Sequence, residues 1–493
     1  MLHPAVTAFL ERPPGLVIGG GRRPAAGQDR APVTDPGTGE QIGMIVMADE
    51  ADVDAAVRAA DDAFRQGSWG RMPIPERATH LRRLADLIDE RSGILAQIES
   101  LDEGKPVGDA AFYDVPQVSA TLRYYADLSE SIPMRRRLDA SGVDAYAQLQ
   151  PYGVCGFIVP WNAPLLLLGW ALGAALAAGN TAVIKPASDA SMSLLYLGEV
   201  CLEAGLPAGV VNVVTGTGPQ AGMALAGHPG VRRLAFTGSP EAGRQVSEVC
   251  GRNLTPVKLE LGGKGAAVVF DDVDIASTVR DLAGALTLNA GQVCCMPSRW
   301  IVHERIAESF LEAATEELSS IAVGHGLANG TRMGPLINER QRTRVADYLA
   351  RGRDQGATTI LAGGPVTLPD LEGGSFVRPS ILLGGPDNVC ASEEIFGPVA
   401  YVTTFATEDE ALEVANATAY GLANSVWTED DERATRVAEA MSAGTSWINC
   451  HNVFSHGVPY GGWHQSGMGG GVLSAEAYRD YLRVKAVVRV ARA

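Results

Sequence analysis

The chain has 493 residues, which is too long for one hydrophobic core and predicts two to four folded units. Its composition, 46% hydrophobic and 20% charged, is typical of a folded α/β protein and excludes a disordered or fibrous one. The formal net charge of −17 argues against nucleic-acid and membrane partners, and the short basic run Arg135 to Arg137 is interpreted as a solvated helix end or hairpin edge.

The N-terminal residues show no basic segment followed by an apolar run and a small-residue cleavage site. We therefore expect no secretory signal and a cytoplasmic location. The apolar stretches 153–160 and 165–178 are interpreted as buried core, because the first is too short to span a membrane and glycines interrupt the second. The seven cysteines have no CxxC or Cys/His spacing, so we expect reduced thiols, no disulfide framework and no metal site.

Two helical stretches are predicted after a turn-rich start at Asp35 to Gly37. Residues 52–65 have apolar side chains at three- and four-residue spacing, which indicates an amphipathic helix. A second helical stretch begins after Pro75 and ends at the breaker Gly104 to Pro106. Both stretches are interpreted as scaffold.

From residue 153 the pattern changes to short β-rich runs that alternate with helices. The expected elements are strand 156–159, helix 165–178, strand 181–184, helix 191–204 and strand 210–214. A second series of this kind starts at residue 265 and includes 299–302, 310–318, 359–361, 400–405, 411–415 and 446–449. Alternation predicts parallel strands with helical crossovers, and hence two Rossmann-like α/β domains joined near residues 260–264.

Two further segments, 146–151 and 481–490, are predicted to be exposed strands outside both α/β units. Exposed strands need partners, and pairing between subunits is one way to cover them. The pattern therefore favours an oligomer.

Three motifs carry candidate chemistry. Cys294 follows Asn289 to Val293, where a glycine lets the backbone approach a ligand and a thiolate could attack a carbonyl carbon, although a buried cysteine is more often an inert hydrophobe. Glu260 ends an apolar run before a glycine-rich turn and can serve as a base, or form a surface salt bridge with Lys264. Asn162 follows strand 156–159 at its carboxyl end and could donate to an oxyanion.

These motifs, in this order, resemble the aldehyde dehydrogenase superfamily over nearly the whole chain. The resemblance extends to Ile184–Pro186, Phe236–Ser239, Glu393–Pro398, Pro459–Gly462 and Ser466–Gly467. It implies a non-acylating enzyme that oxidises an aldehyde to the carboxylic acid with NAD or NADP and water, through a thioester on Cys294. The acylating, coenzyme A dependent branch is disfavoured, because it typically lacks the base kept here as Glu260.

The resemblance also implies roles for individual residues. Cys294 is the expected nucleophile, Glu260 the base for the deacylating water, and Asn162 with the Cys294 N–H the oxyanion ligands. The implied cofactor ligands are Trp161, Lys185, Ser188, Gly238, Ser239, Gly243, Leu261, Glu394 and Phe396. Gly238 and Gly243 are expected to bracket a loop entering a helix, whose N–H groups face the pyrophosphate.

The implied substrate tunnel is lined by uncharged residues, namely Ala163, Leu166, Leu167, Trp170, Val293, Phe454 and Tyr460. Such a wall favours an apolar, possibly aromatic, aldehyde. A semialdehyde dehydrogenase and a catalytically weak structural member of the same fold stay open as alternatives.

The sequence departs from the family pattern at two places. Ser188 replaces a glutamate found in many relatives, which predicts that NADP is admitted beside NAD; Ser188 is also a candidate cap for a helix starting near Ala190. Gly470 and Gly471 stand where relatives carry charged residues, including a carboxylate sometimes assigned a proton-relay role. Because Cys294, Glu260 and Asn162 are kept, we expect an active enzyme.

The resemblance implies three structural parts. Residues 1–128 and 152–262 are expected to form the cofactor domain, residues 263–463 the catalytic domain, and residues 129–151 with 464–493 a small β oligomerisation arm. A homodimer or homotetramer is expected.

Overall fold

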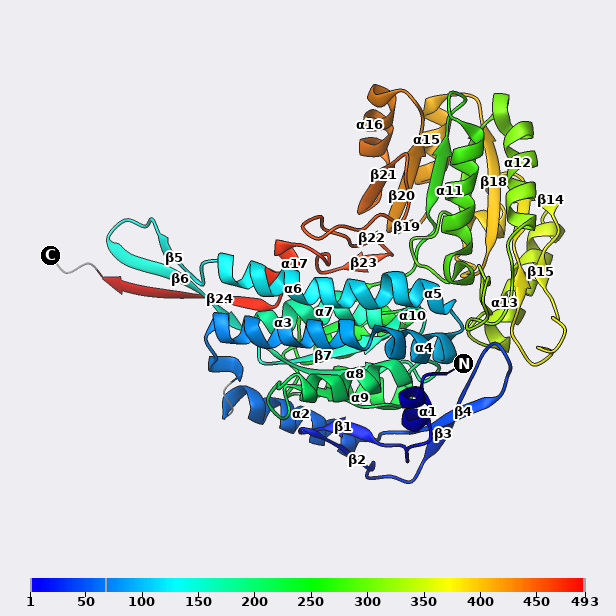
Figure 1. The fold of residues 1–493 in the computed structure, drawn as a ribbon. Helices are drawn as coiled ribbons and strands as arrows, with labels where there is room; N and C mark the ends of the chain where they lie inside the picture. The colour runs from blue at the N-terminus through cyan, green and yellow to red at the C-terminus, as the bar shows by residue number, and fades with distance from the viewer. Residues whose placement is uncertain (1, 67–68, 491–493) are drawn as a thin grey trace.

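The structure, a computed structural model, describes residues 2–66 and 69–490 (Figure 1). Two α/β bodies, each built on a mainly parallel sheet, make up most of the molecule. This arrangement confirms the predicted fold class. No helix among the described residues is long and apolar enough to cross a membrane.

The larger sheet is formed by β1 (Leu16–Ile18), β2 (Gly21–Arg23), β7 (Val154–Val159), β8 (Thr181–Pro186), β9 (Val211–Val213), β10 (Arg233–Thr237), β11 (Val257–Glu260) and β23 (Gly467–Met468). Their order across the sheet is β2-β1-β9-β8-β7-β10-β11-β23, and the five strands from β9 to β11 are parallel. β7 and β8 are buried along their whole length, which explains their continuous apolar sequences. The predicted strands at 156–159, 181–184 and 210–214 are confirmed.

The strand order of the larger sheet reverses between β7 and β10. From β7 the chain continues to β8 and β9 on one side, and it then returns to β10 and β11 on the other. In open α/β sheets, ligands bind outside the carboxyl ends of the strands at such a point. The fold therefore places residues 160–163, after β7, and 238–239, after β10, where a ligand would bind.

Helices cover both faces of the larger sheet. They include α2 (Glu50–Arg65), α3 (Ile74–Glu90), α4 (Ser92–Glu103), α6 (Val115–Ser131), α7 (Pro164–Ala177), α8 (Met192–Glu203), α9 (Met223–Gly227) and α10 (Pro240–Arg252). α6 packs between α3 and α7 (Figure 1). Alternating side chains of β7 serve two cores, since Phe157 packs in the cluster with α3 and α7 and Ile158 in the cluster with α2.

One helix prediction is wrong. The stretch after Pro75 is two helices, α3 and α4, which are separated at Arg91 with φ −106° and ψ 15°. The apolar spacing continues through this break, and Gly93, two residues after Arg91, is the local signal that the prediction overlooked. After α4, a short helix α5 (Val107–Asp109) leads into a π-helical turn at Ala110–Asp114, before α6 begins.

The second sheet is formed by β12 (Ala266–Val269), β13 (Arg299–His303), β14 (Thr358–Leu361), β17 (Ser380–Leu383), β18 (Val399–Phe405), β20 (Ala423–Trp427) and β21 (Thr445–Ile448). The order is β14-β17-β18-β13-β12-β20-β21, and six strands are parallel. The segment at 359–361 is the exception, because β14 pairs antiparallel with β17 at the edge of the sheet. Helices α11 (Ile275–Thr287), α12 (Ala307–Ser319), α13 (Glu339–Asp354), α15 (Glu408–Asn416) and α16 (Asp431–Ala440) belong to this body.

A three-stranded antiparallel sheet projects away from both bodies (Figure 1). It contains β5 (Arg135–Leu138), β6 (Val143–Pro151) and β24 (Leu482–Val490), with β6 in the middle. The predicted exposed strands thus pair with each other, and the basic run 135–137 is an exposed hairpin edge. Elsewhere in the predicted arm, β23 joins the larger sheet and α17 (Ala475–Asp480) contacts α7, while residues 491–493 lie outside the described residues.

Candidate active site

Cys294 lies in a strained loop that follows α11. Asn289, Ala290 and Gly291 all have positive φ, at 49°, 54° and 72°, which L residues rarely adopt. A Cβ on Gly291 would lie 2.4 Å from the carbonyl carbon of Gly397. A glycine is therefore required at 291 because the backbone of residue 397 packs against it. The sequence analysis instead predicts that this glycine lets the backbone approach a ligand.

The Cys294 thiol is partly buried among other polar groups. Its Sγ lies 3.8 Å from the Tyr460 hydroxyl, while the neighbouring Cys295 thiol is buried and donates to Asn452 Oδ1 at 3.1 Å. Contact with the Cys295 thiol, together with burial, raises the pKa of Cys294. The resting group is therefore a protonated thiol that needs a base before it can act as a nucleophile. All seven cysteines are free.

Asn162 is fixed beside the Cys294 loop by two hydrogen bonds. The Asn162 side-chain Nδ2 donates to the Gln292 backbone carbonyl at 2.8 Å, and the Asn162 backbone carbonyl accepts from the Asn289 side-chain amide. An amide has two N–H donors, and the bond to Gln292 uses one of them. The other donor can serve an oxygen bound next to Cys294.

Glu260 ends β11 and is mostly buried. Neither carboxylate oxygen has a hydrogen-bond partner among the described residues, and burial raises the pKa of Glu260 to about 7, against the opposing effect of Lys258. The Lys258 ammonium lies 3.7 Å from Glu260 Oε1. The alternative of a surface salt bridge to Lys264 is wrong, because the Lys264 side chain is itself buried and its Nζ has no partner in the described part of the chain.

Glu260 and Cys294 line one small cavity. Its volume is about 30 Å³, enough for a water molecule, and Lys258, Trp170 and Tyr460 also contribute to its wall. The structure thus brings the Cys294 thiol and the Glu260 carboxyl to a space where a water molecule could contact a group attached to the sulfur.

A much larger cleft of about 910 Å³ opens at the switch point of the larger sheet and reaches Cys294. Six of the predicted cofactor residues line it, namely Trp161, Gly238, Ser239, Leu261, Glu394 and Phe396. Trp161 and Phe396 meet edge to face with ring centroids 5.3 Å apart, and Ser239 caps α10, which begins at the cleft. A helix N-terminus and an aromatic pair in a polar cleft fit a dinucleotide.

Glu394 is held at the junction of the two bodies. Its Oε1 accepts a hydrogen bond from the Gly263 N–H at 2.8 Å, and burial raises the pKa of Glu394 to about 7. This hydrogen bond links the segment after β11 to the Glu394 segment, and both segments line the cleft.

Three predicted cofactor residues do not line this cleft. Gly243 lies inside α10, where a Cβ would collide with Leu261, so it does not belong to a loop. Lys185 is buried in β8, its Nζ donates to the Gly216 carbonyl at 3.1 Å, and burial lowers the pKa of Lys185 to about 8. Ser188 lies in the turn after β8 and caps no helix, because α8 begins at Met192.

The sequence prediction missed a basic side of the cleft. Arg340, Arg344 and Arg351 on α13 line it, and Arg344 donates to the carbonyls of Glu394 and Ile395. Their spacing along an amphipathic helix was the available signal. These cations can attract the phosphates of a dinucleotide.

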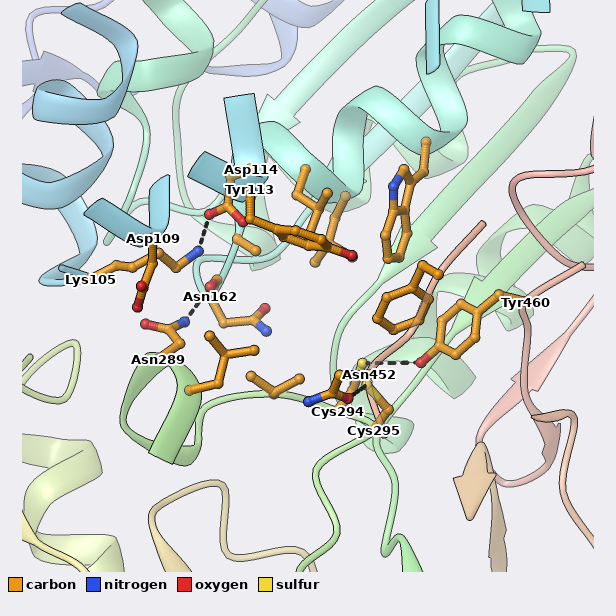
Figure 2. Close-up of a pocket in the computed structure, with 17 residues that line it drawn as sticks. Lys105, Asp109, Tyr113, Asp114, Asn162, Asn289, Cys294, Cys295, Asn452 and Tyr460 are labelled. Atoms are coloured by element: carbon orange, nitrogen blue, oxygen red, sulfur yellow. Dashed lines mark hydrogen bonds and ion pairs between the residues drawn. The ribbon is translucent and has the colours of Figure 1, made fainter. Parts of the chain in front are cut away.

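A separate, mostly apolar pocket of about 70 Å³ lies on the other side of Cys294 (Figure 2). All seven predicted substrate residues line it. Trp170, Phe454 and Tyr460 form an aromatic group with ring centroids 4.9–5.8 Å apart. Tyr113, which the sequence prediction missed, adds a fourth ring from the π-helical turn before α6.

The prediction of an entirely uncharged pocket is wrong. Lys105, Asp109 and Asp114 line the end of the pocket opposite Cys294 (Figure 2). The Lys105 ammonium is buried and pairs with Asp114 and with Glu103, the latter at 2.9 Å. Asp109 has no ion-pair partner among the described residues, and burial raises the pKa of its carboxyl. Lys105 belongs to the breaker that ends the predicted scaffold helix, whereas the sequence analysis predicts no role for Asp109 and Asp114.

Comparison with known proteins places this geometry in a family. Residues 23–487 match the model of the aldehyde dehydrogenase family. Betaine aldehyde dehydrogenase 1 of Oryza sativa is 43% identical, covering 96% of this chain and 95% of its own, and aminoaldehyde dehydrogenase 2 of Zea mays is 41% identical, covering 96% and 95%. An NAD⁺ complex of aldehyde dehydrogenase from Bacillus cereus superposes with a TM-score of 0.97 at 38% identity, covering 100% and 99% of the two chains.

Proposed function

The chain belongs to the aldehyde dehydrogenase family, and from this premise we propose that Cys294, Glu260 and Asn162 are its catalytic residues. The enzyme is an NAD(P)-dependent aldehyde dehydrogenase. The observation that supports the assignment of residues is that Cys294 lies where the cofactor cleft, the apolar pocket and the small cavity with Glu260 meet.

In the proposed mechanism, the Cys294 thiol gives its proton to solvent water in the adjoining cavity, and the thiolate sulfur adds to the aldehyde carbon. The carbonyl oxygen becomes an alkoxide, which the free N–H of Asn162 stabilises. NAD(P)⁺ bound in the cleft supplies the hydride acceptor. A water molecule in the cavity then attacks the thioester carbon and gives a proton to Glu260, the C–S bond breaks, and the carboxylic acid leaves.

The residues proposed to hold NAD(P) are assigned to different parts of the cofactor according to where they lie in the structure. Trp161, Leu261 and Phe396 offer apolar contacts near Cys294, Glu394 is placed for a ribose hydroxyl, and Gly238 with Ser239 offers the start of α10 to the pyrophosphate. Lys185 and Ser188 remain candidates for the adenosine end.

We propose that the substrate is an apolar aldehyde, with aromatic aldehydes included. Support comes from the aromatic wall of the pocket, and Ala163, at the start of α7, leaves room beside Cys294. The semialdehyde alternative has less support, since the ammonium of Lys105 is already paired with two carboxylates and is not free for a substrate carboxylate.

A second candidate is an aldehyde with a cationic group. The carboxylate of Asp109 at the far end of the pocket favours it, because aromatic rings and a carboxylate together bind ammonium groups. Two relatives are named for betaine aldehyde and aminoaldehyde.

An aldehyde panel tests both candidates. Phenylacetaldehyde, benzaldehyde, betaine aldehyde, 3-aminopropionaldehyde and succinic semialdehyde are assayed with NAD and with NADP. The first proposal predicts the highest kcat/KM for the two aromatic aldehydes, and a preference for the amino compounds that Asp109→Asn removes would establish the second candidate. A preference for succinic semialdehyde would contradict both.

We also propose that the three-stranded sheet pairs subunits in a homodimer or homotetramer. β24 is an edge strand of nine residues, and Val484, Val488 and Val490 on it are 70%, 59% and 76% exposed. Light scattering of the enzyme and of Val488→Lys tests this proposal, and a monomer at micromolar concentration would contradict it.

A further inference from the structure

Lys258 is a buried lysine that shares one face of β11 with Glu260. The two residues are two positions apart in a strand, so their side chains project from the same side. The Lys258 side chain is only 2% exposed, and its ammonium lies 3.7 Å from Glu260 Oε1. A charged group is rarely buried to this degree unless a partner compensates for the lost hydration.

The glycine segment that departs from the family pattern completes the lysine site. The Lys258 ammonium donates to the Gly471 carbonyl. A Cβ on Gly471 would lie 2.6 Å from the Tyr460 carbonyl oxygen, and one on Gly470 would lie 2.3 Å from Asp480 Oδ2. Backbone packing thus excludes a side chain at 471, a φ of 89° disfavours one at 470, and the Gly471 carbonyl approaches the lysine instead.

The other charged and titratable groups around this pair are few. Asp480 on α17 faces Lys258 and also pairs with Arg233 on β10 at 3.5 Å, while Tyr460 and Cys294 lie on the Glu260 side. Burial lowers the pKa of Lys258, and Glu260 and Asp480 oppose that effect. Lys258 is therefore the cation that faces the Glu260 carboxylate, and both residues line the cavity that reaches Cys294.

We propose that Lys258 is a positioning residue for thioester hydrolysis, whose ammonium holds Glu260 as a carboxylate directed into the Cys294 cavity. The inference rests on the proposed role of Glu260 as the base. A buried carboxyl with no cation beside it would bind a proton at neutral pH and could not accept one from water. With Lys258 present, water transfers its proton to Glu260 as its oxygen bonds to the thioester carbon and the C–S bond breaks.

The test separates the first turnover from hydrolysis. Lys258→Met keeps the length and removes the charge, so the initial burst of reduced nicotinamide should stay within about twofold of wild type while steady-state turnover falls about tenfold or more. The pH midpoint of turnover should rise by about one unit or more, because the opposite charge is lost. Lys258→Arg keeps a cation and should hold the midpoint near the wild-type value.

Two further variants make each outcome decisive. Lys258→Gln retains a donor for the Gly471 carbonyl and carries the same expectation as Lys258→Met should the latter fold poorly. Glu260→Gln is run beside them with mass spectrometry of the quenched enzyme. If Glu260→Gln accumulates a thioester while Lys258→Met and Lys258→Gln keep the wild-type burst ratio and pH midpoint, Lys258 has no such role. If Glu260→Gln hydrolyses the thioester normally, the proposed function itself fails.

Discussion

The two spaces that meet at Cys294 differ in size and in chemistry. Both spaces are lined by residues of both α/β bodies, but the pocket of about 70 Å³ has mainly apolar and aromatic walls, whereas the cleft of about 910 Å³ has many polar and charged residues. The pocket can select by shape and by excluding water, and the cleft can hold a long, charged molecule by many separate contacts. Placing the thiol between them lets one sulfur serve both.

The largest expected effect comes from removing the shared atom. Cys294→Ala should lower turnover by about 10⁴-fold or more, because no other group can form the thioester. The Kd for NAD, measured by calorimetry, should stay within about threefold of the wild-type value, because the residues that line the cleft are unchanged. Turnover near the wild-type value would show that the two spaces do not meet at the reacting atom.

A smaller loss should follow from opening the pocket while leaving the cleft intact. Trp170→Ala removes a ring that contacts both Phe454 and Tyr460, so kcat/KM for phenylacetaldehyde should fall about 100-fold, equivalent to about 3 kcal/mol. Trp170→Phe is the matched control and should recover most of the activity. An equal effect of Trp170→Ala on KM for NAD would contradict the separation of the spaces.

The pH dependence sharpens the role of the third space, the cavity with Glu260. Burial raises the pKa of Glu260 to about 7, and only the ionised form can accept a proton from water. Steady-state turnover should therefore rise with pH through about 7 and fall about tenfold for each unit below it. The first-turnover burst need not follow this curve. A turnover rate that is flat from about pH 5.5 to 8 would contradict the assignment of the base.

The smallest effect concerns the turn after β8, which does not line the cleft and which we propose contacts the adenosine end of the cofactor. Ser188→Glu would place a negative charge in the turn after β8, which should raise KM for NADP relative to that for NAD by about tenfold, or about 1.4 kcal/mol. Ser188→Gln, with similar size and no charge, is the control. An unchanged ratio of NADP to NAD in Ser188→Glu would show that another residue selects the cofactor.

The sequence prediction succeeded where local patterns and the sheet agree. Continuous apolar runs predicted β7, β8 and β9, and the motifs after β7 and at the end of β11 predicted that Asn162 and Glu260 lie at one edge of the sheet, where the structure has them. Side chains in a strand alternate between its two faces, so Lys258 and Glu260, two residues apart in β11, lie on the same face. The predicted salt-bridge partner of Glu260 was Lys264, whereas the lysine beside Glu260 is Lys258.

The failures have a tertiary origin. Gly93 lies beside the break at Arg91, and Gly108 and Pro116 flank the π-helical turn at 110–114, but these local signals do not predict that Asp109 and Tyr113 line the pocket. Their place depends on how α6 packs on α7. Gly291 and Gly243 were assigned to ligand contacts, yet each meets another part of the chain, which no local pattern records.

The central claim is that a thioester forms on Cys294 and that Glu260 directs its hydrolysis. Glu260→Gln, mixed with NAD and an aromatic aldehyde and quenched in acid within the first turnovers, should gain the mass of one acyl group on the Cys294 peptide. Cys294→Ala, treated in the same way, should gain none. An acyl adduct on another residue, or no adduct in Glu260→Gln while the acid product forms at the wild-type rate, would contradict the account.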